Sequence, residues 1–220
     1  MTRHESTPHE ETAVGLRFLY RPGAHATAPL VVLVHGRAGD RTVMWMFERS
    51  IPADCHVVAF EAFIPDAIGG WSWWDISSPG SKSEAILCAA DRLNRALEGF
   101  LALYSLTPSH RIGLGFSQGS ILVSGVALKG RFEFDGVGVL AGAVFRPIES
   151  HGASGKTSFF IAHGSLDQTI PVTQARAGVA DLQNLGFLVQ YVEEEVGHKV
   201  GVQGTRALKG WLMGVLGRSE

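Results

Sequence analysis

Short apolar runs alternate along this chain with longer segments in which apolar positions recur at helical spacing. The runs are rich in β-branched residues, and an uninterrupted run of this kind predicts a strand buried on both faces. We expect such strands at residues 30–34, 57–60, 111–115, 137–141, 158–162 and 187–192. Helices are expected at residues 42–49, 83–104, 118–129, 172–185 and 202–216. This alternation predicts an α/β fold in which helices flank a mainly parallel central sheet on both faces.

The first residues differ in character from the rest of the chain. Residues 1–12 are polar and acidic, so we expect a flexible, solvated arm. Residues 13–21 alternate between apolar and polar positions and predict an edge strand. No linker, repeat or low-complexity segment follows, so residues 13–220 are predicted to form a single domain. The arm lacks the apolar stretch of a secretory signal, and no run of about 18 apolar residues predicts a membrane span.

Charge and cysteine content narrow the classes of partner. The chain carries 19 basic and 21 acidic side chains, which gives no reason to expect nucleic acid or an anionic membrane as a partner. Its two cysteines, Cys55 and Cys88, are too few for a disulfide framework, and neither has the spacing of a metal ligand. We therefore expect no bound metal and a reducing, cytoplasmic location.

A serine lies at the predicted junction between the strand at residues 111–115 and the helix that follows it. Ser117 is flanked by Gly115 and Gly119 in the pattern G-x-S-x-G. Small flanking residues suit a nucleophile on a sharp turn, because the strand and helix backbones approach too closely for side chains there. The alternative is an ordinary serine that caps the helix in a glycine-rich turn.

Two further polar residues follow predicted strands and complete a catalytic arrangement. Asp167 and His198 follow Ser117 in the order serine, acid, histidine that is expected of such a turn in an α/β fold. His198 would take the serine proton and deliver it to the leaving group, and Asp167 would orient His198. His198 is the only histidine after Asp167. Rival carboxylates between the serine and the histidine include Asp135, Asp181, Glu193, Glu194 and Glu195.

A developing oxyanion needs donors close to the serine. The main-chain N–H of Gln118 directly follows the nucleophile, and a second donor is expected in the loop after residues 30–34. Arg37, which follows His35 and Gly36, is the expected second donor through its main-chain N–H. Its guanidinium is also a candidate contact for an acidic group on the substrate.

Three tryptophans stand out in the long connection after residues 57–60. Trp71, Trp73 and Trp74 are candidates for the wall of a substrate pocket, since such pockets are mostly apolar. Two other interpretations stay open, namely burial against the body of the protein and a contact within a homodimer. Residues 44–47 could line the same cleft, although an ordinary amphipathic helix explains them as well.

Four motifs together resemble the phospholipase/carboxylesterase family of small α/β-hydrolases, which includes acyl-protein thioesterases. They are residues 33–40 (L-V-H-G-R-A-G-D), residues 115–119 (G-F-S-Q-G), residues 163–167 (H-G-S-L-D) and residues 197–198 (G-H). The resemblance implies an α/β-hydrolase fold with a small or absent lid, a cytosolic serine hydrolase without cofactor, and ester or thioester substrates. Two positions depart from the family pattern, because Ala38 and Ser120 stand where the family often has glycine.

These observations predict a serine carboxylesterase that acts on small-molecule esters with small or medium acyl chains. A thioesterase or lysophospholipase acting on longer acyl chains is the alternative among enzymes. A non-catalytic binding module on the same fold is the alternative of another class, because a fold does not fix a function.

Overall fold

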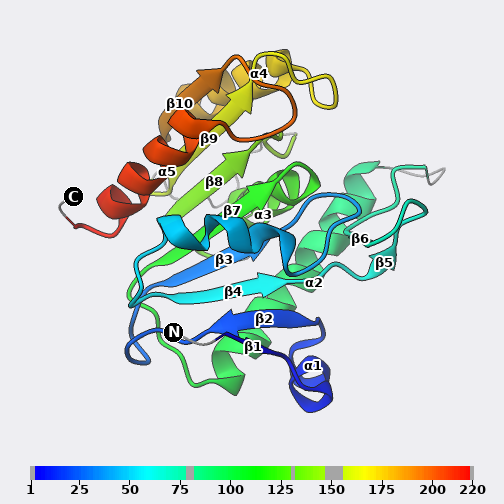
Figure 1. Ribbon diagram of the computed structural model, residues 1–220, viewed down its shortest axis with the longest axis vertical. Helices are drawn as coiled ribbons and strands as arrows, with labels where there is room; N and C mark the ends of the chain where they lie inside the picture. Colours follow the sequence, from blue (N-terminus) through cyan, green and yellow to red (C-terminus); the bar gives the residue numbers. More distant parts are fainter. Residues whose placement is uncertain (1–2, 78–81, 130–131, 147–155, 219–220) are drawn as a thin grey trace.

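A sheet of eight strands runs through the computed structural model, which describes residues 3–77, 82–129, 132–146 and 156–218 (Figure 1). In spatial order these strands are β1 (His4–Glu5), β2 (Phe18–Arg21), β4 (His56–Phe60), β3 (Leu30–Val34), β7 (Arg111–Phe116), β8 (Gly136–Leu140), β9 (Ser158–Gly164) and β10 (Leu188–Glu194). Adjacent strands from β4 to β10 are parallel, whereas β1 and β2 form an antiparallel edge. The predicted mainly parallel sheet is confirmed.

Helices cover both faces of this sheet. One face packs against α1 (Pro8–Val14), α2 (Lys82–Leu103), α3 (Gln118–Leu128) and α4 (Val172–Asn184). The other face, nearer the viewer in Figure 1, packs against the 3₁₀ helix η1 (Val43–Ser50) and α5 (Val202–Val215). Successive strand residues point to opposite faces, so Val32 joins the first core and its neighbours Val31 and Leu33 join the second. This is why the strands are apolar throughout instead of alternating.

The register of the central strands brings the chemistry-bearing loops to one edge. Val34 at the end of β3 pairs with Gly115, and Gly115 pairs with Val139 near the end of β8. The loops that follow β3, β7, β9 and β10 therefore leave the sheet at the same edge, where α/β folds place their ligands. A small hairpin, β5 (Ile64–Pro65) and β6 (Trp71–Ser72), projects from the same end of the molecule (Figure 1).

Residues 4–5 form a strand and residues 8–14 a helix, which differs from the flexible arm expected over residues 1–12. Within the described part, β1 pairs with β2, and α1 begins with a capping box. Thr7 Oγ1 accepts the Glu10 N–H at 3.4 Å, and Glu10 Oε2 accepts the Thr7 N–H at 2.6 Å. Glu10 also accepts a hydrogen bond from Tyr104 on the segment after α2. The predicted edge strand begins only at Phe18, because the residues up to Val14 belong to α1.

None of the helices in the described ranges is long and apolar enough to cross a membrane.

Candidate active site

Ser117, His198 and Asp167 form one chain of hydrogen bonds at the carboxyl edge of the sheet. His198 Nδ1 lies 2.7 Å from Asp167 Oδ2, and His198 Nε2 lies 3.0 Å from Ser117 Oγ. In the tautomer that satisfies both contacts, Nδ1–H donates to the carboxylate and Nε2 accepts the hydroxyl proton of Ser117. The structure thus brings together the three residues that the chain order singled out. Such an arrangement can activate the serine as a nucleophile.

Ser117 stands on a strained turn between β7 and α3. Its backbone has φ 51° and ψ −115°, in a region that residues with a side chain rarely adopt. A Cβ at Gly119 would lie 2.2 Å from the carbonyl oxygen of Val34, so only glycine lets the turn approach β3 this closely. The Ser117 side chain makes no capping hydrogen bond to α3, which does not support the alternative of a simple helix cap.

Asp167 is held as a carboxylate by several donors. Its Oδ1 accepts the main-chain N–H groups of Thr169 and Ile170 at 2.8 and 2.9 Å. Burial raises the pKa of this carboxyl, but the hydrogen bonds from His198 and from these two N–H groups outweigh burial and lower the pKa below its ordinary value. His163 lies beneath the same turn, with Nε2 2.9 Å from the Ile170 carbonyl oxygen. The Asp167 carboxylate therefore stays ionised beside His198 Nδ1.

Four of the five rival carboxylates, all except Glu195, have other partners. Asp135 accepts the main-chain N–H of Arg111, at the opposite end of β7 from Ser117. Asp181 lies on α4 and pairs with Arg146. Glu193 accepts hydrogen bonds from Arg176 and Tyr191. Glu194 accepts the main-chain N–H groups of Gln203 and Gly204. None of these contacts involves His198.

The loop after β3 lies against the serine turn. A Cβ at Gly36 would lie 3.1 Å from Ser117 Cβ, which brings the next residue, Arg37, next to the nucleophile. The main-chain N–H groups of Arg37 and Gln118 have no acceptor in the portion of the chain that the structure describes. Two free donors on the two sides of a nucleophile suit a developing oxyanion.

The hairpin holds this loop through a carboxylate. The Arg37 guanidinium donates twice to Asp66, at 2.8 and 3.1 Å, and Ser72 Oγ donates to the same carboxylate at 2.8 Å. Ser72 Oγ in turn accepts the Ala38 N–H at 3.2 Å. Ala38 has φ 58°, so it adopts a left-handed conformation that glycine would adopt without strain. The Arg37 guanidinium is thus bound within the protein, which argues against its predicted contact with an acidic substrate group.

Two of the three tryptophans are buried beside the site. Trp73 is 1 % exposed and Trp74 3 % exposed, and both belong to the core under the serine turn. Trp73 Nε1 donates to the His35 carbonyl oxygen at 2.8 Å. Trp71 is half-buried, with the Arg17 guanidinium 4.3 Å from its ring centroid. The structure therefore favours the interpretation of burial over that of a pocket wall for Trp73 and Trp74.

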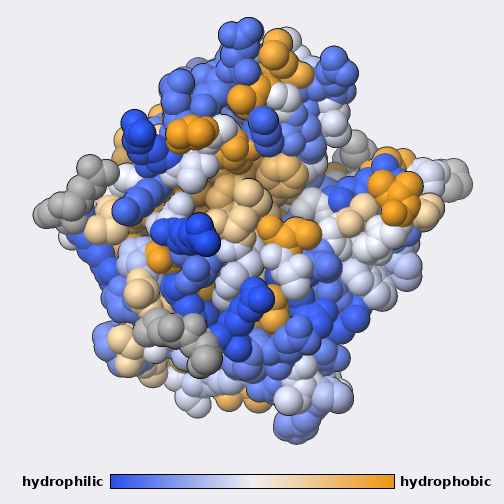
Figure 2. Space-filling view, in the orientation of Figure 1, coloured by the Kyte–Doolittle hydropathy of each residue, from blue (hydrophilic) through white to orange (hydrophobic). Residues whose placement is uncertain are grey.

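An apolar cavity of about 280 Å³ adjoins the loop after β3, which holds Arg37. It is bounded by that loop, by η1 and by the residue before the nucleophile, and its lining residues are Gly36, Arg37, Ala38, Gly39, Val43, Met44, Met46, Phe47 and Phe116. Figure 2 shows apolar residues across the middle of this face, in the region between η1 and α5 of Figure 1. Of residues 44–47, Met44, Met46 and Phe47 line the cavity and Trp45 does not. None of Trp71, Trp73 and Trp74 lines it.

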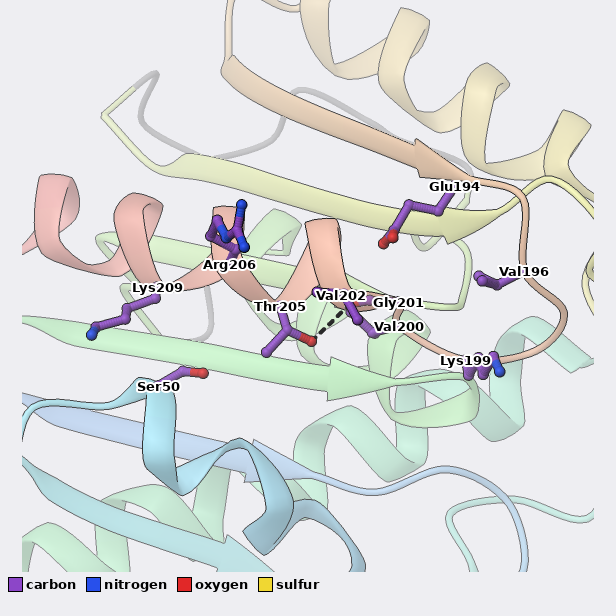
Figure 3. Close-up of a pocket in the computed structure, with 10 residues that line it drawn as sticks. All are labelled: Ser50, Glu194, Val196, Lys199, Val200, Gly201, Val202, Thr205, Arg206 and Lys209. Carbon is purple, nitrogen blue, oxygen red and sulfur yellow. Dashed lines mark hydrogen bonds between the residues drawn. The ribbon is translucent and has the colours of Figure 1, made fainter.

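A second hollow of about 620 Å³ lies between α5, the His198 loop and Ser50 (Figure 3). Its three cationic side chains, Lys199, Arg206 and Lys209, point in different directions instead of converging on one point. No group of three or more His, Cys, Asp or Glu side chains within the described ranges is arranged to hold a metal ion. Within the described residues, we therefore take the hydrogen-bonded triad as the candidate active site.

The sequence model of the phospholipase/carboxylesterase family matches residues 21–213. The chain therefore belongs to this family of serine hydrolases. No curated protein matches the sequence significantly.

Solved structures share the fold at low sequence identity. The carboxylesterase of Bacillus cereus superposes with a TM-score of 0.84 at 16% identity, covering 94% of this chain and 98% of its own. A carboxylesterase from Mesorhizobium loti gives 0.82 at 20% identity, with 97% and 100% covered. Esterase PE8 gives 0.77 at 24% identity, with 89% and 97% covered. At these identities the likeness establishes the α/β-hydrolase fold.

Proposed function

We propose that the protein hydrolyses carboxylic esters with small or medium acyl chains through a covalent acyl-enzyme on Ser117. The observation that carries this proposal is the chain of hydrogen bonds from Asp167 through His198 to Ser117, beside two free main-chain donors. A binding module would have no need of a strained serine turn and an oriented imidazole.

The reaction follows from the positions of these groups. Ser117 Oγ forms a bond to the acyl carbon while His198 Nε2 takes its proton, and Arg37 and Gln118 donate to the oxyanion. The bond to the alcohol oxygen then breaks, and that oxygen receives the proton from His198. A water molecule, deprotonated by His198, then attacks the acyl carbon of the acyl-enzyme. The bond to Ser117 Oγ breaks, His198 returns the proton to that oxygen, and the acid is released. Asp167 stays ionised and stabilises the imidazolium.

A series of nitrophenyl esters of increasing acyl length tests the proposal, with Ser117→Ala beside the wild type. We expect turnover of short and medium chains that is lost in the variant. A preference for long chains would instead support the thioesterase or lysophospholipase alternative.

A fluorophosphonate probe supplies a second readout, because it labels an activated serine without turnover. Labelling at Ser117 in the wild type is expected. A folded wild-type protein that neither reacts with the probe nor cleaves any ester would support the binding module instead.

A further inference from the structure

The cavity beside the loop after β3 has a buried floor and an exposed rim. Met44 and Phe47 are 2 % and 4 % exposed and form the floor, whereas Val43 and Met46 are 48 % and 74 % exposed. All four come from η1, so one short helix shapes the cavity. Since a cavity of about 150 Å³ holds a benzene-sized group, about 280 Å³ leaves room for about ten non-hydrogen atoms.

Phe116 connects this cavity to the proton-transfer side of the site. It directly precedes Ser117, lines the cavity, and its ring centroid lies 5.2 Å from that of His198. The oxygen of a leaving alcohol must come within hydrogen-bond reach of His198 Nε2, because Nε2 supplies its proton. The leaving substituent therefore begins beside His198, and the acyl substituent points away from it.

We propose that this cavity binds the alcohol substituent of the ester, and that the substituent is uncharged and apolar. This inference rests on the esterase function proposed above and adds the class of alcohol. The only charged residue in the lining is Arg37, and its guanidinium is bound to Asp66. A charged alcohol would therefore find no partner for its charge there. Aryl, benzyl and branched aliphatic alcohols match the volume and the lining.

Two methionines make the cavity adaptable. Met44 and Met46 have unbranched side chains that fill irregular spaces and change rotamer easily. We therefore expect several alcohols of similar size to be accepted. Discrimination against larger alcohols depends on the rim at Met46 and on the floor at Phe47.

Two matched ester series test the assignment. In the first, acetate is kept and the alcohol varies from methyl through butyl and benzyl to naphthylmethyl. In the second, the alcohol is nitrophenol and the acyl group varies from acetyl to octanoyl. Met46→Trp narrows the mouth at an exposed position, so the fold should be retained. Phe47→Leu enlarges the floor with little change of polarity, and its Tm is measured alongside.

Met46→Trp is expected to lower kcat/KM for benzyl acetate about tenfold relative to methyl acetate, as the loss of favourable apolar contacts in a specificity pocket does. The ratios within the acyl series should stay unchanged. Phe47→Leu should favour alcohols larger than benzyl. The control is Val202→Trp, which changes a residue that is 75 % exposed at the second hollow and should alter neither series.

Three outcomes would overturn the inference. If Met46→Trp changes the acyl series and not the alcohol series, the cavity binds the acyl group. If it changes neither series, the cavity is no substrate subsite. In both cases the esterase function stands, provided that Ser117→Ala is inactive. Absence of wild-type activity on every ester would overturn the inference together with the proposed function.

Discussion

The side chain of Gln118 binds the main chain of Trp73 across the site, its Oε1 accepting the Trp73 N–H at 2.9 Å. Gln118 Nε2 also donates to the Trp74 carbonyl oxygen at 2.9 Å, so the amide is fully engaged with this segment. Trp73 in turn donates from its indole to the His35 carbonyl oxygen. The segment therefore ties the serine turn to the loop after β3, which are the two places that supply the proposed oxyanion donors.

Replacing Gln118 by Ala should lower kcat while leaving the main-chain donor in place. The variant keeps the N–H of residue 118 but loses both bonds to the tryptophan segment, so the two donors are no longer fixed relative to each other. We expect a loss of about 10- to 100-fold in kcat with little change in KM, since small misplacements of catalytic groups have effects of this size. Steady-state kinetics on a short-chain ester provide the measurement.

Gln183→Ala is the matched control, because Gln183 lies exposed near the end of α4. It should retain wild-type kinetics. Unchanged kcat in Gln118→Ala would show that the amide bonds do not position the donors.

A substitution of Arg37 distinguishes the role of its main-chain N–H from that of its guanidinium. Arg37→Ala retains the N–H that the oxyanion would use but removes both bonds to Asp66. We expect less than a tenfold loss of kcat/KM on a neutral ester, and the same relative loss on an ester that carries a carboxylate. Asp66→Asn should have an effect similar to that of Arg37→Ala, because it weakens the same contact. A selective loss on the acidic ester would instead assign the guanidinium to substrate binding.

The sheet and the order of the triad could be predicted from the sequence, because both depend on local patterns. Apolar runs predicted each parallel strand to within two residues, and a chain order with one remaining histidine specified His198. The capping box of Thr7 and Glu10 was also readable and would have predicted α1. The polarity of residues 1–12 taken alone indicates a solvated arm, whereas this motif indicates a helix.

Other features depend on contacts that no local pattern encodes. Gln118 and Trp73 are 45 residues apart, and nothing in either neighbourhood indicates that they meet. For the tryptophan cluster the sequence is compatible with both a pocket wall and burial, because both need the same apolar residues. The same holds for η1, because an amphipathic helix and a cavity wall share one sequence pattern.

Asp167→Asn should abolish most activity while a matched change at Asp181 should not. The amide presents an NH₂ or a neutral oxygen to His198, so the imidazole is no longer held in the tautomer that accepts the Ser117 proton. A loss of about 10³- to 10⁴-fold in kcat is expected from the corresponding change in other serine hydrolases. Asp181→Asn removes a carboxylate that pairs with Arg146 on the surface and should leave kcat within twofold. Near-normal activity of Asp167→Asn would reopen the choice of acid.

His35 should make the protein less stable in mild acid. Its Nδ1–H donates to the Gly36 carbonyl oxygen at 2.7 Å and its Nε2 accepts the Ala62 N–H at 2.9 Å, so the buried ring is neutral. Burial lowers the pKa of His35 from 6.5 to about 4. In the unfolded chain the ring takes up a proton near pH 6.5, whereas the folded protein resists protonation down to about pH 4. The stabilisation is thus complete above pH 6.5 and is lost as the pH falls towards 4, by about 3 kcal/mol in all.

Urea unfolding at several pH values between 4.5 and 7.5 measures this contribution. In the wild type the free energy of unfolding should fall on acidification, and in His35→Gln it should fall less steeply, because glutamine does not titrate. His9→Gln is the control, since His9 is exposed on α1 and should leave the slope unchanged. Equal slopes in wild type and His35→Gln would mean that His35 takes up its proton at the same pH in the folded and the unfolded protein, so that burial does not keep the ring neutral in mild acid.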